Sequence, residues 1–187
     1  MNRVVSWLGA AMLLVIAGVA VATAPQEGTL AAPFRVVGEP GDVITTRSLT
    51  VEVKEVRIAR ELDLPYDSSG IRTGGVWVIV DAVITPSLGT VSTTYAGLVI
   101  GDVTYRVESL PYPSLERIPY GAGVPVRGSL AFEVPESALN GADRAEVWVN
   151  TKNNLQLDSV AVVIIDLSAV PVDSRAIIDG AFVVGIS

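Results

Sequence analysis

Two residue types that carry much of protein chemistry are missing from this chain of 187 residues, which has no histidine and no cysteine. Without histidine there is no imidazole general base, no serine–histidine triad and no imidazole metal ligand. Without cysteine there is no disulfide, no thiolate nucleophile and no lipid-modified cysteine anchor. Carboxylates, tyrosines and tryptophans are the remaining candidates for chemistry.

The carboxylates come closest to a site in two places. Asp63 and Asp67 lie in the polar segment Glu61–Gly75, where they could offer oxygens to calcium, but the ligand alternation of an EF-hand is absent and a solvated hairpin loop is favoured. Asp81 stands in an otherwise apolar run, where a hydrogen bond to a neighbouring strand, or an exposed edge, explains it better than catalysis. No spacing among the 20 acidic residues singles out a glycosidase pair.

We therefore assign no catalytic, cofactor-binding or metal-binding residue, and we expect a protein that is not an enzyme and holds no cofactor. No serine lies in a Gly-x-Ser-x-Gly elbow, and no glycine-rich nucleotide fingerprint is present.

A proline-stiffened segment with two tyrosines, Ser109–Gly123, is the candidate for binding a partner. Its contact residues would be Tyr112, Pro113 and Tyr120, because such a loop loses little entropy when it binds. The alternative is a sandwich crossover that proline holds in place.

Trp77 and Trp148 are expected in or beside the core, although a shared exposed face would make a sugar-stacking platform.

The charge distribution argues against nucleic acid as a partner. Beyond residue 24 the chain has 12 basic and 20 acidic residues, a net charge of −8. An acidic surface repels phosphate backbones, and no basic patch is present to bind them.

The first residues predict a membrane anchor. Val4–Ala24 contains no charged residue, and a helix of that length would span the ~30 Å hydrocarbon layer. Arg3 precedes this segment and the next basic residue is Arg35, so the N-terminus should stay in the cytoplasm and the rest should lie outside it.

A cleaved signal peptide is the competing interpretation, because Ala22-Thr23-Ala24 fits the small residues of a cleavage site. Pro25 directly after that site argues for a retained anchor. We expect a cytoplasmic tip and signal anchor over residues 1–24, a spacer over 25–33 and one extracytoplasmic domain over 34–187.

The domain has the pattern of a β-sandwich, with apolar alternation interrupted every ten or so residues by turn formers. Val76–Ile84 is apolar on both faces and predicts the central core strand. A phase slip predicts a bulge near Glu55, and Gly101-Asp102 predicts a hairpin or a kinked strand.

Three further segments complete the expected architecture of about seven to nine strands. Leu130, Phe132 and Val134 alternate with Ser129, Ala131 and Glu133, which predicts a half-buried strand. Pro135–Leu139 allows one helical turn at most. The apolar tail Ala176–Ile186 closes a sheet edge, pairs with a partner chain or, as we favour, adds a strand to the same domain.

The order of these motifs resembles a known family. Gly101-Asp102 followed by Tyr105, and the stretch Gly121–Pro135 (GAGVPVRGSLAFEVP), resemble a bacterial family of extracytoplasmic immunoglobulin-like sandwiches of unknown function. That family is common in Gram-positive lipoproteins and membrane-anchored proteins, and is similar to a secreted mycobacterial immunogenic sandwich protein. The resemblance implies an immunoglobulin-like β-sandwich and no particular activity.

Together these observations predict a single-pass membrane protein whose extracytoplasmic domain binds or scaffolds another envelope protein, without small-molecule substrate or nucleic acid. The alternative is a protein that binds or acts on cell-wall glycans.

Overall fold

The computed structural model describes Trp7 and residues 12–18, 32–91, 94–108, 110, 113–117, 119 and 121–185. The chain divides into two compact units, Met1–Ala32 and Pro33–Ser187, which are considered separately.

In the first unit, residues 12–18 are helical. Most of the predicted span Val4–Ala24 lies outside the described residues. Within the part that is described, no helix combines the length and apolar character needed to cross a membrane.

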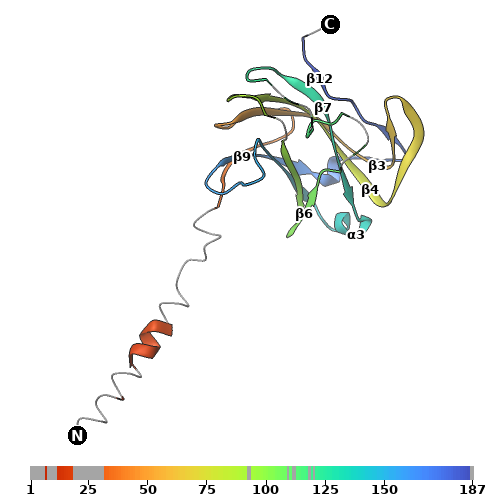
Figure 1. Ribbon diagram of the computed structural model, residues 1–187. Coiled ribbons are helices and arrows are strands. Elements are labelled where there is room, and N and C mark those ends of the chain that lie inside the picture. The colour runs from red at the N-terminus through yellow and green to blue at the C-terminus, as the bar shows by residue number, and fades with distance from the viewer. Residues whose placement is uncertain are drawn as a thin grey trace. The chain divides into compact units, whose positions relative to one another are not determined.

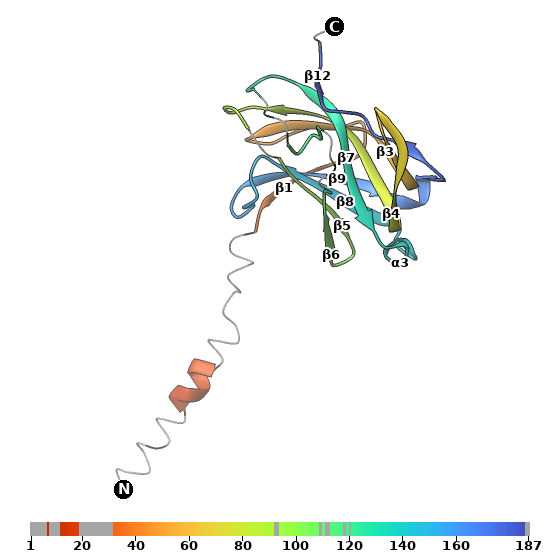
Figure 2. The same ribbon diagram turned by 45° about the vertical axis from the view of Figure 1, so that its right-hand side comes forward.

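The second unit is a β-sandwich of two stacked sheets (Figures 1 and 2). The five-stranded sheet has the order β1 (Phe34–Gly38), β9 (Ser159–Asp166), β8 (Arg144–Asn150), β5 (Tyr95–Ile100), β6 (Val103–Arg106). The seven-stranded sheet has the order β10 (Val172–Asp173), β3 (Leu49–Leu64), β4 (Asp67–Pro86), β7 (Val126–Val134), β12 (Phe182–Val183), and β2 (Val43–Thr45) and β11 (Ala176–Ile177) also pair with β3. A helical turn, α3 (Glu136–Leu139), follows β7, and a 3₁₀ turn, η1 (Leu167–Ala169), follows β9.

β4 is the central strand, as its sequence predicts. It pairs with β3 on one side and β7 on the other. One face, from Val76 to Ile84, packs into the interior between the sheets. The opposite face carries Trp77 and Ile79, which belong to a second apolar cluster. Burial on both faces explains why this strand is apolar at almost every position.

The expected bulge in β3 is confirmed, since the register with β4 shifts between Val53 and Glu55. The Gly101-Asp102 prediction resolves as a hairpin between β5 and β6, with Gly101 in the left-handed region at φ 59°. The stretch Pro135–Leu139, for which the sequence allowed one helical turn at most, contains the single turn α3.

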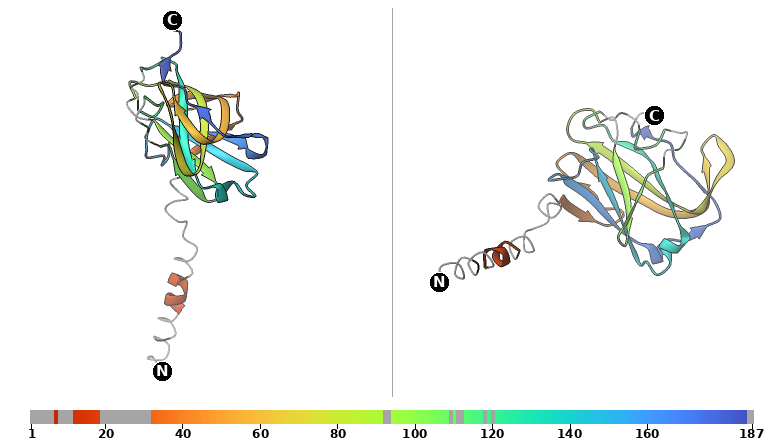
Figure 3. Two further views of the ribbon diagram at one scale, coloured as in Figure 1. Left: turned by 90° about the vertical axis from the view of Figure 1, so that its right-hand side faces the viewer. Right: turned by 60° about the horizontal axis from the view of Figure 1, so that its bottom comes forward.

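The segment Glu61–Gly75, for which the sequence favoured a solvated hairpin loop, is a hairpin, but one whose two strands, the ends of β3 and β4, form a paired arm instead of a long loop. Leu62 pairs with Ile71 and Leu64 with Asp67, so that the turn itself is short. The apolar side chains of Leu62, Leu64 and Ile71 pack with the second cluster, and this packing extends the strands into a polar stretch. The arm projects at one end of the sandwich (Figure 3).

The prediction that β7 is half-buried is wrong, because Ser129 and Ala131 are buried as well as Leu130, Phe132 and Val134. Ala131 packs with Ala176 and Ile178 of the C-terminal tail and with Leu110. The alternation within β7 could not reveal this cover, since the covering residues come from distant parts of the chain.

Twelve strands occur among the described residues, more than the seven to nine expected. The excess consists of short strands at the margins of the seven-stranded sheet. Three of them, β2, β10 and β11, follow one another along the outer edge of β3. At the opposite edge of the sheet, β12 pairs with β7, and Val107 forms a bridge to Phe132 of β7. The described part of the tail thus pairs with its own domain, as favoured.

Candidate functional site

The outer face of the seven-stranded sheet is covered by the C-terminal tail. The second cluster on this face consists of apolar residues from three strands and the tail: Ala59, Leu62, Trp77, Ile79, Ala131, Ala176 and Ile178. The tail contributes Ala176 and Ile178, whose side chains cover the cluster. Burial of these side chains, at roughly 25 cal/mol per Å² of apolar surface, favours the docked tail.

Asp81 lies at the centre of this face and is almost fully buried. One of its oxygens accepts a hydrogen bond from Arg57 Nη2 at 2.6 Å, and the other accepts from the hydroxyl of Ser129. The carboxylate is therefore paired with one neighbouring strand and hydrogen-bonded to the other, as a buried charge requires.

The same two partners reach on to the tail. Arg57 Nη1 donates to the carbonyl of Ile177 at 3.0 Å, and the Ser129 hydroxyl oxygen accepts from the backbone N–H of Asp179 at 2.8 Å. Asp81 thus orients two side chains that hold the tail. This arrangement gives Asp81 a structural role, and it offers no free carboxylate oxygen for catalysis.

Backbone hydrogen bonds continue the attachment along the tail. The N–H of Ile178 donates to Asp63, that of Ala181 to Pro113 and that of Val184 to Pro125, at 2.9–3.1 Å. Gly128 permits the close approach, because a Cβ there would lie 3.0 Å from the Cα of Ala181. The tail is consequently a fixed part of the surface.

An ion-pair group joins the start of the tail to the arm. Arg175 lies 2.9 Å from a Glu61 oxygen and 3.3 Å from Asp63, and Arg72 also pairs with Glu61 at 3.4 Å. These contacts hold the arm against the tail.

The tail and the tip of the arm form a groove of about 390 Å³, lined by Pro65, Tyr66 and residues 177–182. Three large apolar side chains beside it are exposed, with fractions of 94% for Tyr66, 58% for Ile177 and 51% for Phe182. We call this groove and its exposed side chains the tail surface. Exposed aromatic residues on a braced backbone are typical of protein contact surfaces.

Of the predicted partner-binding residues, Tyr112 and Tyr120 lie outside the described residues. Pro113 is exposed, and its carbonyl accepts the hydrogen bond from Ala181. The predicted loop therefore borders the tail surface at this residue. Sequence reasoning missed Tyr66 and Phe182; the apolar tail was noticed, but its position over the sheet depends on contacts between distant segments.

The two aspartates considered for calcium are engaged separately. Asp63 pairs with Arg175, whereas the Asp67 carboxylate accepts from the N–H of Ser69 at 2.9 Å, a hydrogen bond that lowers the pKa of Asp67. Among the described residues there is no group of three or more acidic, histidine or cysteine side chains placed to hold a metal ion.

A cleft of about 450 Å³ opens beside the bulge of β3, and its lining includes Glu55, Lys54, Arg144 and Asp166. Hydrogen bonds from Ser168 lower the pKa of Asp166; the bond from its hydroxyl has the larger effect and the bond from its N–H the smaller one. A glycosidase acid needs a raised pKa, so Asp166 is poorly suited to that role.

Trp77 and Trp148 lie on different sheets and do not share a face. Trp77 is buried in the second cluster and donates to the Ile71 carbonyl at 3.0 Å. Trp148 is on β8, and the Arg35 guanidinium lies 5.3 Å from the centre of its ring. One face of the Trp148 ring is therefore occupied by Arg35.

Neither a protein-family model nor a curated protein matches the chain. Among solved structures, the chain is similar to an uncharacterized β-sandwich protein from Clostridium difficile 630, with 11% identity and a TM-score of 0.44 over 76% of this chain and 99% of the other. The class of this protein, a β-sandwich, follows from its own two sheets.

Proposed function

We propose that this protein is a membrane-tethered, extracytoplasmic, immunoglobulin-like β-sandwich that binds another envelope protein through the tail surface and performs no catalysis. The observation that carries the proposal is the exposure of Tyr66, Ile177 and Phe182 around one groove. A partner with apolar side chains would cover them and gain the corresponding burial free energy.

The rigidity of the tail surface supports this function. The Arg57–Asp81–Ser129 contacts hold the tail in one position before any partner arrives. A preorganised surface loses little conformational entropy on binding, so more of the contact energy remains as affinity.

The tether is supported by the apolar character of the N-terminal helix. Residues 12–16 are all large apolar side chains, and all of them are exposed. A helix that is hydrophobic all round is stable where lipid or protein covers it. The resemblance to extracytoplasmic sandwiches, many of them anchored in membranes, agrees with this location.

Partner binding is tested by capture from membranes with the full-length protein as bait. Replacing Tyr66 and Phe182 by serine should abolish retention of a partner that the wild type retains. The matched control is Val103→Ser, which removes a similarly exposed side chain on β6 and should change nothing. Equal retention by all three proteins would refute the role of the tail surface.

The tether and its orientation are tested with single cysteines, for which the natural chain has no background. Asn153→Cys should react with a membrane-impermeant maleimide in intact cells, and the protein should stay in the membrane after carbonate extraction. A mature N-terminus at Pro25, or loss of the protein into the carbonate supernatant, would contradict the anchor.

A further inference from the structure

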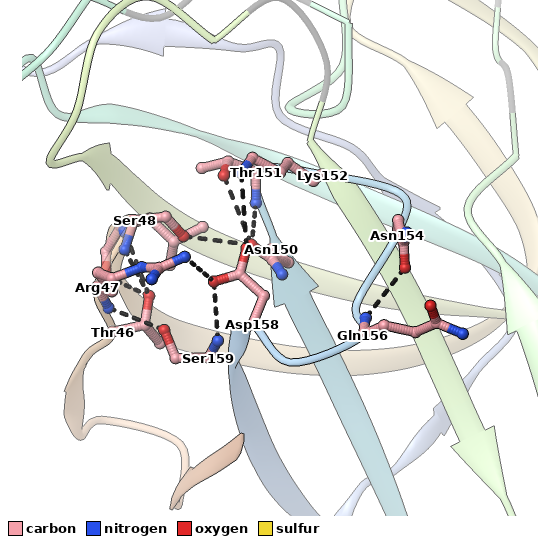
Figure 4. Close-up of polar contacts among 11 residues, drawn as sticks. Thr46, Arg47, Ser48, Asn150, Thr151, Lys152, Asn154, Gln156, Asp158 and Ser159 are labelled. Atoms are coloured by element: carbon pink, nitrogen blue, oxygen red, sulfur yellow. Dashed lines mark hydrogen bonds and ion pairs between the residues drawn. The ribbon is translucent and has the colours of Figure 1, made fainter. Parts of the chain in front are cut away.

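A second surface of the sandwich lies where the chain enters the domain. Phe34 begins β1, and its N–H donates to the carbonyl of Asp158 at 2.8 Å. The connection between β2 and β3 meets the β8–β9 loop here, since Arg47 N donates to the Ser159 hydroxyl at 3.0 Å. We call the group Phe34, Arg47, Lys152, Leu157 and Asp158 the Leu157 surface; its polar contacts are shown in Figure 4.

The cations of this surface outnumber its acids. The side chain of Asp158 is 6% exposed, and it pairs with Arg47 at 3.0 Å and with Lys152 at 3.9 Å. Both basic side chains are about two-thirds exposed, at 69% and 67%. One buried carboxylate therefore orients two cations that face solvent, on a domain that is acidic as a whole.

Leu157 presents a large apolar side chain near the end of the same loop, two residues before β9 begins. It is 61% exposed, and it is the non-glycine residue with positive φ, 53°, among the described residues. Asn or Gly would adopt this left-handed conformation more easily. A strained and exposed leucine is therefore a feature that folding alone does not favour, and such outliers point to function.

Phe34 adds a second exposed apolar side chain at the point where the chain arrives from the N-terminal segment. The spacer 25–33 can span at most about 30 Å even when fully extended. If the predicted anchor ends at Ala24, Phe34 cannot be farther than this from the bilayer surface.

We propose that the Leu157 surface docks on an anionic bilayer, an inference that rests on the proposed tether. Leu157 and Phe34 enter the headgroup region, and Arg47 and Lys152 pair with lipid phosphates. Apolar side chains flanked by cations have the chemistry that binds such interfaces. The arm extends at the other end of the sandwich from the β8–β9 loop (Figures 1 to 3), so docking leaves the tip of the arm with Tyr66 free.

The test uses the full chain in lipid nanodiscs, either of phosphatidylcholine alone or of phosphatidylcholine and phosphatidylglycerol in equal parts. Asn153→Cys carries an environment-sensitive dye on the β8–β9 loop, and Asp102→Cys carries it on the β5–β6 turn as a control. In anionic discs the dye at residue 153 should shift to the blue and be quenched by spin-labelled lipid, whereas the control should remain in water.

Two variants separate docking from folding. Leu157→Asn relieves the left-handed backbone, yet it should lower the docking equilibrium roughly tenfold because a buried leucine is lost. Lys152→Gln should reduce the preference for anionic discs about fivefold, the effect of one cation near such a surface. A defect caused by misfolding would not accompany the improved stability expected of Leu157→Asn.

The outcomes that overturn the inference are distinct from failure of the tether. A dye that stays in water while the protein remains in the discs refutes docking and leaves the tether in place. Shielding that is equal in neutral discs, or that persists in Leu157→Asn, assigns the contact to another partner, such as a second copy. Protein that elutes free of lipid refutes the tether and docking together.

Discussion

Asp81 and Asp158 are both buried carboxylates paired with arginine, but their arginine partners differ in exposure and in what they contact. The partner of Asp81, Arg57, is itself largely buried, with 21% of its side chain exposed. The partners of Asp158 extend into solvent. The first carboxylate directs its charge pair inward to brace the tail, whereas the second displays two cations at the surface. The same local chemistry thus stabilises one region and prepares another for contact.

The largest effect is expected when the buried ion pair between Asp81 and Arg57 is broken. Asp81→Leu leaves Arg57 buried without its carboxylate and should lower the free energy of unfolding by about 3–5 kcal/mol. Asp158→Leu should lower it by only about 1 kcal/mol, because its partners are solvated. Urea unfolding of the full chain in detergent, followed by tryptophan fluorescence, measures both.

A double variant sharpens that result. Arg57→Met combined with Asp81→Leu removes both buried charges and should recover most of the lost stability. Similar losses for Asp81→Leu and Asp158→Leu would show that the two pairs are equivalent and would refute the contrast.

The next effect concerns the approach of the tail to β7. Gly128→Ala places a methyl group against the backbone of Ala181 and should destabilise the protein by about 1–3 kcal/mol. Gly74→Ala is the control, since a Cβ there meets nothing within 4 Å. The same unfolding measurement applies. Equal free energies of unfolding for the two variants would mean that the tail can move away from the added methyl group without loss of stability.

A smaller effect of opposite sign is expected at the Leu157 surface. Leu157→Asn should stabilise the protein by about 1 kcal/mol, because asparagine tolerates positive φ better than leucine does. Leu88→Asn tests exposure alone, since Leu88 is equally exposed but has no positive φ. A thermal melt that shows no gain for Leu157→Asn would remove the argument from strain.

The smallest effect is a pH dependence at Asp166. Hydrogen bonds from Ser168 hold its pKa below the usual value near 3.8, so their contribution to stability is complete above that pH and is lost as the pH falls through the lowered pKa. Asp166→Asn should therefore flatten the acid side of the stability curve slightly. Superimposable curves for variant and wild type from pH 5 to pH 2 would contradict the shift.

The elements that the sequence predicted well are those whose signal is local. Val76–Ile84 is apolar on both faces, Glu55 interrupts an alternation and Gly101 supplies a turn, so each could be located from neighbouring residues. At Glu61–Gly75 the hairpin was predicted but the extent of its strands was not, because the polar composition conceals three apolar side chains that pack with the second cluster.

The candidate site was harder to predict for the same reason. Asp81 was noticed as an acid in an apolar strand, but its partners Arg57 and Ser129 come from the two adjacent strands. Tyr66 and Phe182 are more than 100 positions apart in the sequence, and pairing in the folded sheet brings their segments to one groove. A pattern within a single segment carries no information about such a meeting.

The short strands beside β3 protect the sheet from edge-to-edge aggregation where many copies lie close together. Open sheet edges recruit strands from neighbouring molecules and begin aggregation. The chain after η1 supplies β10 and β11 on one edge of the sheet and β12 on the other, so one segment covers part of both edges. A single proteolytic cut after Leu167 that released the rest of the chain would expose parts of two sheet edges and a hydrophobic face at once, and aggregation through those edges is the expected result.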